Sequence, residues 1–292
     1  QILAQALSRG KDPVNWVELT RNFSLIAWLS LTAGIILGGW WSYMELGWGG
    51  YWAWDPVENA SLIPWFAGTA FLHTAVAQRR RGSLKRFNVF MVSLTLIMAF
   101  FATYLVRSGV VDSLHAFGDG GVGTPLLIFI IFFTLLTVFT CLGSFRNESR
   151  ALGDILSREG FLFVTSWILM ILGLVIMLGT MWPVITTALG QVPQGLEAGF
   201  YNTVCLPFFV LISLMVTTCP WLGWKTGLSS KRNFLMLLGL FVGLCVVLFL
   251  AGNTQPVALL GAASALACMA GILLLLFTDK SVRRVRTTWA AY

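Results

Sequence analysis

Charged side chains are scarce in this sequence: they make up 11% of its 292 residues, whereas 57% of the residues are hydrophobic. Soluble domains carry about 25% charged residues. This scarcity excludes a soluble globular domain and indicates a chain that lies in a lipid bilayer. The net charge of +7 does not indicate a nucleic-acid partner, because the cations are spread over five short segments and not gathered on one surface.

Metal-binding and redox patterns of cysteine are also missing. The sequence has no C-x-x-C pair and no spacing typical of a zinc site. Each cysteine falls within an apolar segment, so we interpret them as small buried side chains. They are Cys141, Cys205, Cys219, Cys245 and Cys268.

Apolar residues, by contrast, occur in long uncharged runs. A membrane-spanning helix needs about 20 such residues. The last run is too long for one span, and the turn-forming sequence from Gly252 to Pro256 divides it. The sequence therefore predicts an all-α, polytopic membrane helix bundle with about eight transmembrane helices, near 23–44, 59–78, 87–106, 125–145, 160–182, 203–224, 233–252 and 257–278.

The cations predict how these helices are oriented. Of the 19 lysines and arginines, only Arg107 lies in a loop on the opposite side from all the others. Because short cytoplasmic loops are enriched in Lys and Arg, both termini are predicted to be cytoplasmic. The loops 45–58, 107–124, 183–202 and 253–256 then face outward, and the prolines and glycines of 183–202 predict an irregular cap to which we assign no site.

The first outward loop leads into the segment WGGYWAWDPVENASLIPW, residues 48–65, which contains four tryptophans and two glycines. Aromatic side chains are common at membrane interfaces, which is one interpretation. Rings on a glycine-hinged loop also suit a planar aromatic ligand, through stacking and burial. Both interpretations stay open on chemistry alone.

The same segment contains the expected start of a helix. Asp55 is suited to be the N-cap, Pro56 the first helical residue, and Glu58 the residue that reaches back to the cap. Pro64 is expected to bend the helix that follows.

Histidine is the scarcest candidate metal ligand, with two in the chain. His73 lies deep in the second predicted helix and is either a packing residue or an iron ligand, because intramembrane ionisable groups are often functional. An imidazole buried there without a partner costs about 1–3 kcal/mol, which a metal bond would offset. His115 lies in the second outward loop, so the two histidines belong to different sites. Arg107 beside it can pair with Asp112 or Asp119, or hold an anionic group such as a propionate.

Taken with GGWWSYMELGWGG before it and GTAFLHTA and TYLVRSGVVDSLHAF after it, the tryptophan-rich segment resembles the CcmF family of haem lyase subunits of cytochrome c maturation. NrfE-type relatives are the alternative within this resemblance. The resemblance is strong over about residues 30–120. It implies that His115 ligates the iron of an outer haem and that His73 ligates a separate haem b in the membrane. The residues that it implies hold the outer haem are Trp48, Gly49, Gly50, Trp52, Trp54 and Asp55, and Arg107 is our additional candidate for its propionates.

The resemblance also implies the activity, a haem lyase that attaches haem to apocytochrome c carrying a C-x-x-C-H motif. The implied partners are a haem chaperone, the apocytochrome and other maturation subunits in the bilayer. The implied location is the bacterial inner membrane, with the outer haem site facing the periplasm. The alternatives are a haem-binding module without lyase activity and an unrelated membrane transporter.

The sequence departs from the family pattern in two ways. Tyr51 and Ala53 stand where larger aromatics are common, and the family's upstream outward histidine and second membrane histidine are missing. We therefore expect the chain to be the central portion of such a protein. Its predicted parts are a cytoplasmic segment 1–22, a haem-handling core 23–124, further transmembrane helices 125–278 and a cytoplasmic tail 279–292.

Overall fold

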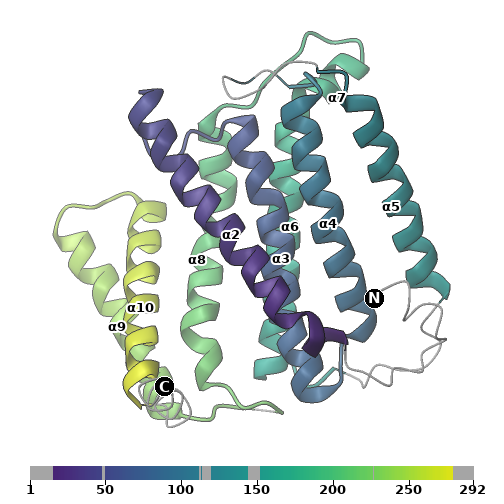
Figure 1. Cartoon of the computed structure of the whole chain (residues 1–292). Coiled ribbons are helices and arrows are strands. Elements are labelled where there is room, and N and C mark those ends of the chain that lie inside the picture. The colour runs from purple at the N-terminus through teal and green to yellow at the C-terminus, as the bar shows by residue number, and fades with distance from the viewer. Residues whose placement is uncertain are drawn as a thin grey trace. The chain divides into compact units, whose positions relative to one another are not determined.

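A computed structural model of the chain describes residues 16–47, 50–111, 113, 120–143, 152–225 and 227–278. These residues form long helices joined by short connections (Figure 1). The helices are α2 (Trp16–Glu45), α3 (Pro56–Arg81), α4 (Lys85–Arg107), α5 (Gly123–Gly143), α6 (Arg158–Thr180), α7 (Trp182–Ala188), α8 (Ala198–Thr218), α9 (Lys231–Leu250) and α10 (Pro256–Thr278).

Eight helices in this described part of the chain are long and apolar enough to cross a membrane, which confirms the predicted number. The largest difference from the expected bounds is at α2, which begins at Trp16 and not near residue 23. Its first turns contain Glu18 and Arg21, which end the apolar run. Charged residues of this kind do not end a helix, so α2 continues beyond its apolar part.

Two connections between helices test the turns that we predicted from glycine and proline. As predicted, the turn after α9 separates it from α10, which begins at Pro256. The prediction of an irregular segment at 183–202 was wrong in part, because the short helix α7 begins at Trp182 and includes Pro183 in its first turn. Proline fits the first turn of a helix as well as an irregular loop, so its presence alone did not distinguish the two.

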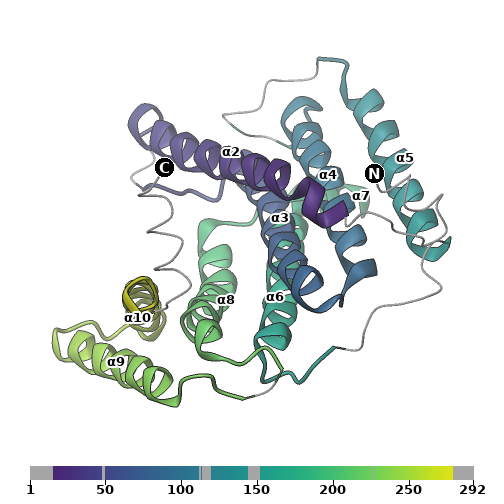
Figure 2. The same cartoon turned by 60° about the horizontal axis from the view of Figure 1, so that its bottom comes forward.

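The chain divides into two compact units. Unit 1 comprises the described residues up to Leu152 together with Ser166–Tyr201, and unit 2 comprises Gly153–Thr165 and the described residues from Asn202 onward. In unit 1, α3 packs between α2 and α4, and α2 crosses it obliquely (Figures 1 and 2). In unit 2, α9 and α10 lie side by side.

Two reciprocal hydrogen bonds hold α2 against α3. The Trp28 indole donates to the Thr69 hydroxyl at 2.8 Å, and the Trp65 indole donates to the Thr32 hydroxyl, also at 2.8 Å. The two indole rings stack with their centroids 5.9 Å apart. Because each donor lies one helix away from its acceptor, the four residues fix the register of the two helices.

Contacts at the two ends of unit 1 show which loops lie together. Arg79 at the end of α3 pairs with Glu18 at the start of α2. At the opposite end of α3, Asp55 accepts a hydrogen bond from Ser113, which follows α4. The arginine-rich end of α3 and the tryptophan segment therefore lie at opposite ends of the helices, as the predicted sidedness requires.

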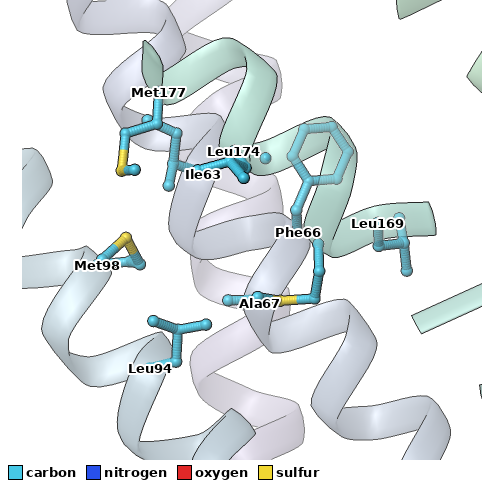
Figure 3. A pocket seen from close by; sticks show the side chains of 10 residues that line it. Ile63, Phe66, Ala67, Leu94, Met98, Leu169, Leu174 and Met177 are labelled. Atoms are coloured by element: carbon cyan, nitrogen blue, oxygen red, sulfur yellow. The ribbon is translucent and has the colours of Figure 1, made fainter. Parts of the chain in front are cut away.

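A cavity of about 110 Å³ lies in the interior of unit 1, between α3, α4 and α6. Figure 3 shows Ile63, Phe66 and Ala67 of α3 facing Leu94 and Met98 of α4, with Leu169, Leu174 and Met177 of α6 completing the wall. The lining is apolar and the volume is below the roughly 300–1,000 Å³ of ligand pockets. We assign this cavity to helix packing.

Removing one hydrogen bond of the α2–α3 pair is expected to destabilise the protein slightly. Trp28→Phe and Trp65→Phe should each lower the free energy of unfolding by about 0.6 kcal/mol, the typical value for interhelical hydrogen bonds in membranes. Unfolding in mixed detergent micelles measures this. Trp40→Phe, at an indole that is 58% exposed, is the control and should have no effect. Equal stability of all three variants and the unmodified protein would contradict the role of the pair.

The orientation in the membrane is tested by reporter fusions. A reporter after Arg81 should report a cytoplasmic location, and one inserted within 118–123 an outward location, because most cations lie at the first of these ends. The reverse result at either point would place the tryptophan segment on the other side of the membrane.

Candidate functional site

The tryptophan loop, residues 45–58, is described from Gly50 onward after a gap, so Trp48 and Gly49 lie outside the described residues. The Tyr51 ring folds back onto α2, and its hydroxyl donates to the Ile36 carbonyl oxygen. The ring passes close to Gly39, where an added Cβ would lie 3.1 Å from Tyr51 Cε1. Glycine at position 39 therefore allows the loop to return along the helix it has just left.

The start of α3 confirms the predicted capping residues. The Asp55 carboxylate accepts from the Val57 backbone N–H at 2.9 Å. Glu58 reaches back and accepts from the N–H groups of Ala53 and Asp55, at 3.0 and 3.2 Å. Pro56 is the first residue of the helix, which continues through Pro64 without interruption. This capping box fixes the last residues of the tryptophan loop to the first turn of α3.

Trp54 has an unusual backbone conformation, with φ at +60°. Only a few per cent of non-glycine residues adopt this left-handed region, and they do so where the surrounding contacts enforce it. The carbonyl oxygen of Trp54 accepts from Asn59 Nδ2 at 3.0 Å. The Trp52 ring meets the Trp54 ring edge-on, with centroids 6.1 Å apart and planes at 87°. The two tryptophans that follow each other along the loop therefore point their rings in different directions.

Tyr201, in the first turn of α8 and within the 183–202 segment to which we assigned no site, contacts this loop. Its ring stacks on Trp54 with a centroid distance of 5.0 Å and an angle of 10° between the planes. Tyr201 is 2% exposed. No sequence signal paired these two residues, because they lie far apart in the chain and neither belongs to a spacing pattern.

The second outward loop approaches the tryptophan loop through Ser113. Its hydroxyl donates to the Asp55 carboxylate at 2.7 Å. Val111, two residues earlier, packs in a buried cluster with Ala60 and Leu105. The described residues do not include Asp112, His115 or Asp119. Ser113, which precedes His115 by two residues in the chain, lies at the edge of the tryptophan loop. Arg107 at the end of α4 is exposed.

His73 lies in α3, about 27 Å along the helix axis from Asp55 at 1.5 Å per residue. Its Nδ1 lies 2.7 Å from the Thr69 carbonyl oxygen. A carbonyl oxygen only accepts, so Nδ1 carries the proton and Nε2 carries the lone pair. The preceding turn of its own helix supplies this acceptor, so the imidazole has a hydrogen-bond partner, as the packing interpretation requires. This hydrogen bond leaves Nε2 as the nitrogen suited to a metal.

No cluster of three or more His, Cys, Asp or Glu side chains suited to a metal ion occurs among the residues that the structure describes. Within these residues the histidine donor is the single imidazole of His73. Single axial imidazoles fit haem iron, whose other ligands come from the porphyrin. The five cysteines are free thiols.

A larger cavity of about 400 Å³ lies between α2, α3 and α4. Trp28, Pro64 and Phe71 are among its lining residues, and His73 is not. Its lining has no ionisable side chain to fix a polar ligand.

Comparisons with known proteins show what the chain is similar to. Residues 5–111 match the model of the cytochrome c assembly proteins. The chain is 39% identical to the cytochrome c-type biogenesis protein CycK of Bradyrhizobium diazoefficiens, over 76% of this chain and 34% of that protein. It is 35% identical to a probable cytochrome c-type biogenesis protein NrfE of Escherichia coli, over 85% of this chain and 44% of that protein.

A solved structure of the cytochrome c haem lyase CcmF has the same fold. It matches 97% of this chain and 42% of its own chain, with a TM-score of 0.76 and 34% sequence identity. The chain thus spans between a third and a half of the length of these relatives. In its sequence, its eight candidate membrane helices and its fold, the chain is similar to the CcmF-type cytochrome c biogenesis proteins over a third to a half of their length.

Proposed function

We propose that the tryptophan loop holds haem as a substrate on the outer side of the membrane, with His115 as the ligand to its iron. The hydrogen bond between Ser113 and Asp55 carries this proposal, because it joins the loop that contains His115 to the loop that contains the tryptophans. The similarity of the chain to cytochrome c-type biogenesis proteins supports haem as the ligand that this loop holds.

The residues of the loop fit a flat ligand with carboxylates. Trp52 is half-buried, and its indole nitrogen is a buried donor without an acceptor among the described residues. A planar macrocycle stacks on such a ring, and a carboxylate can accept from an indole N–H. Arg107 is exposed at the same end of unit 1 and offers a bidentate donor for a propionate. Trp48, Gly49 and Gly50 are proposed to complete the loop's contact with haem.

The proposed reaction joins this haem to an apocytochrome c. Each thiol of a C-x-x-C-H motif adds across one vinyl group: a carbon–sulfur bond forms, the vinyl double bond becomes single, and the thiol hydrogen is transferred to the other vinyl carbon. The addition has no net redox change, but thiols and iron must be in the reduced state to react. The protein's part is to orient the haem edge toward the thiols.

We propose that His73 holds a second, resident haem of the b type in the membrane. The Nδ1 hydrogen bond to Thr69 fixes the ring orientation and leaves Nε2 for iron. When bound, that group supplies one-electron chemistry to keep the outer haem reduced. This chain offers no second intramembrane histidine, so the other axial ligand is proposed to come from sequence outside it.

The proposed partners follow from the reaction. A haem chaperone delivers haem to the tryptophan loop, the apocytochrome approaches from the same side, and other maturation subunits join in the bilayer. We place the protein in the bacterial inner membrane, with the tryptophan loop facing the periplasm. Exposed aromatic side chains suit a membrane–water interface, and those near this loop are Trp40, Trp41 and Tyr51.

The outer site is tested by His115→Ala and Trp52→Ala in the full-length protein. Both are expected to lower the haem retained at the loop and to stop holo-cytochrome c formation, since one removes the iron ligand and the other removes a stacking ring worth about 0.5–1.5 kcal/mol beyond its burial. Haem staining of periplasmic cytochromes and the Soret absorbance of the purified protein measure the two effects. Trp40→Ala is the matched control. A normal holo-cytochrome yield in both variants would leave the tryptophans as an interfacial belt only.

The inner site is tested by His73→Ala. This change should abolish the b-type reduced-minus-oxidised spectrum and leave haem binding at the outer loop intact, because the two positions lie about 27 Å apart along α3. Thr74→Ala, at the next and fully buried position, is the control for helix packing. A b-type spectrum that survives His73→Ala unchanged would make His73 a packing residue and remove the electron relay from the mechanism.

A further inference from the structure

We infer that Tyr201 is a positioning residue of the outer haem site: it holds Trp54, and with it the tryptophan loop, in the conformation that presents Trp52 to haem. This inference rests on the proposed function of the loop. It assigns a role to the first turn of α8, to which neither the sequence patterns nor the ligand chemistry assigned one.

The conformation that needs to be held is that of Trp54. Its φ of +60° is unfavourable for a residue with a bulky side chain. A free loop would relax to negative φ and turn the ring away. The loop therefore needs contacts that fix both the backbone and the side chain of this residue.

The first turn of α3 fixes the backbone. Glu58 accepts from the N–H groups on either side of Trp54, those of Ala53 and Asp55, and Asn59 donates to the Trp54 carbonyl oxygen. These hydrogen bonds are local and define where the chain passes. They do not fix the direction of the indole ring.

Tyr201 fixes the ring. The two rings are nearly parallel, at 10°, with centroids 5.0 Å apart, which is an offset-stacked geometry. Tyr201 is itself held in place because α6 passes directly behind it at Gly179. A Cβ added to Gly179 would lie 2.9 Å from Tyr201 Oη and 3.0 Å from Cε1. The tyrosine ring consequently has no room to withdraw toward α6.

This arrangement gives Trp52 and Trp54 different roles. One face of Trp54 is covered by Tyr201, so Trp54 serves to anchor the loop. Trp52 stands at 87° to it and keeps a buried indole N–H without an acceptor among the described residues. Trp52 is thus the ring that contacts haem, and Trp54 acts through it.

The first experiment titrates haem into the full-length protein and follows quenching of tryptophan fluorescence and the Soret band. Tyr201→Ala is expected to weaken outer-site binding about tenfold, because the stack and its burial are both lost. Tyr201→Phe keeps the ring and should bind haem within about twofold of the unmodified protein. Trp40→Ala removes an aromatic ring of α2 that is 58% exposed, and should have no effect.

A second pair of variants tests the position of Tyr201 without changing the loop: one displaces its ring, and the other is the control. Gly179→Ala must displace the tyrosine ring and should weaken haem binding as Tyr201→Ala does. Gly173→Ala places the same methyl group in the same helix, 3.6 Å from Phe66 Cβ, which is an ordinary contact. It should bind haem normally. The His73-dependent spectrum should stay unchanged in all five variants, and Tyr201→Phe, which keeps the buried ring, should also keep the unfolding temperature.

The outcomes separate the two proposals. Unchanged haem affinity in Tyr201→Ala, with affinity lost in Trp52→Ala, would overturn the role of Tyr201 and leave the proposed function standing. Loss of the b-type spectrum in Tyr201→Ala would also overturn it, since Tyr201 would then support the fold as a whole. Unchanged affinity in Trp52→Ala would overturn the haem site itself, and the role of Tyr201 with it.

Discussion

The Asp55 carboxylate accepts hydrogen bonds on which the end of unit 1 with the tryptophan loop depends. Those from the backbone of the first turn begin α3, and another comes from Ser113, 58 residues further along the chain. A carboxylate at a helix N-terminus is stabilised by the unpaired N–H groups there, so its position is well defined. Through this one group the cap of a membrane helix, the tryptophan loop and the loop that leads to His115 share a fixed reference point.

Helix α3 connects the two positions at which we propose haem to bind. It is the most buried of the candidate membrane spans, and it carries the capping box at one end and His73 near the other. Between them, Trp65 and Thr69 bond to α2. Thr69 also provides the carbonyl oxygen that orients His73. A rigid, buried helix is suited to keep two redox groups at a constant separation, because its length is fixed by its own hydrogen bonds.

Much of the fold was predictable because membrane helices are encoded locally. Runs of apolar residues gave the eight spans, and the turn before Pro256 gave the division of the last run. The capping box was also predictable, since Asp55 and Glu58 act on backbone groups within five residues of themselves. The bounds of α2 and the presence of α7 were not predicted, because hydropathy reports where lipid ends and not where a helix ends.

The sequence by itself determined that this is a membrane helix bundle, which helix carries the lone intramembrane histidine, and how that helix begins. Each of these depends on residues close together in the chain. Only the tertiary structure decided that Tyr201 stacks on Trp54 and that Ser113 reaches Asp55. It also showed that Trp52 and Trp54, equivalent in the sequence, have different surroundings. The physical reason is that ring stacking and loop contacts depend on which helix ends meet in space, and packing between helices sets this.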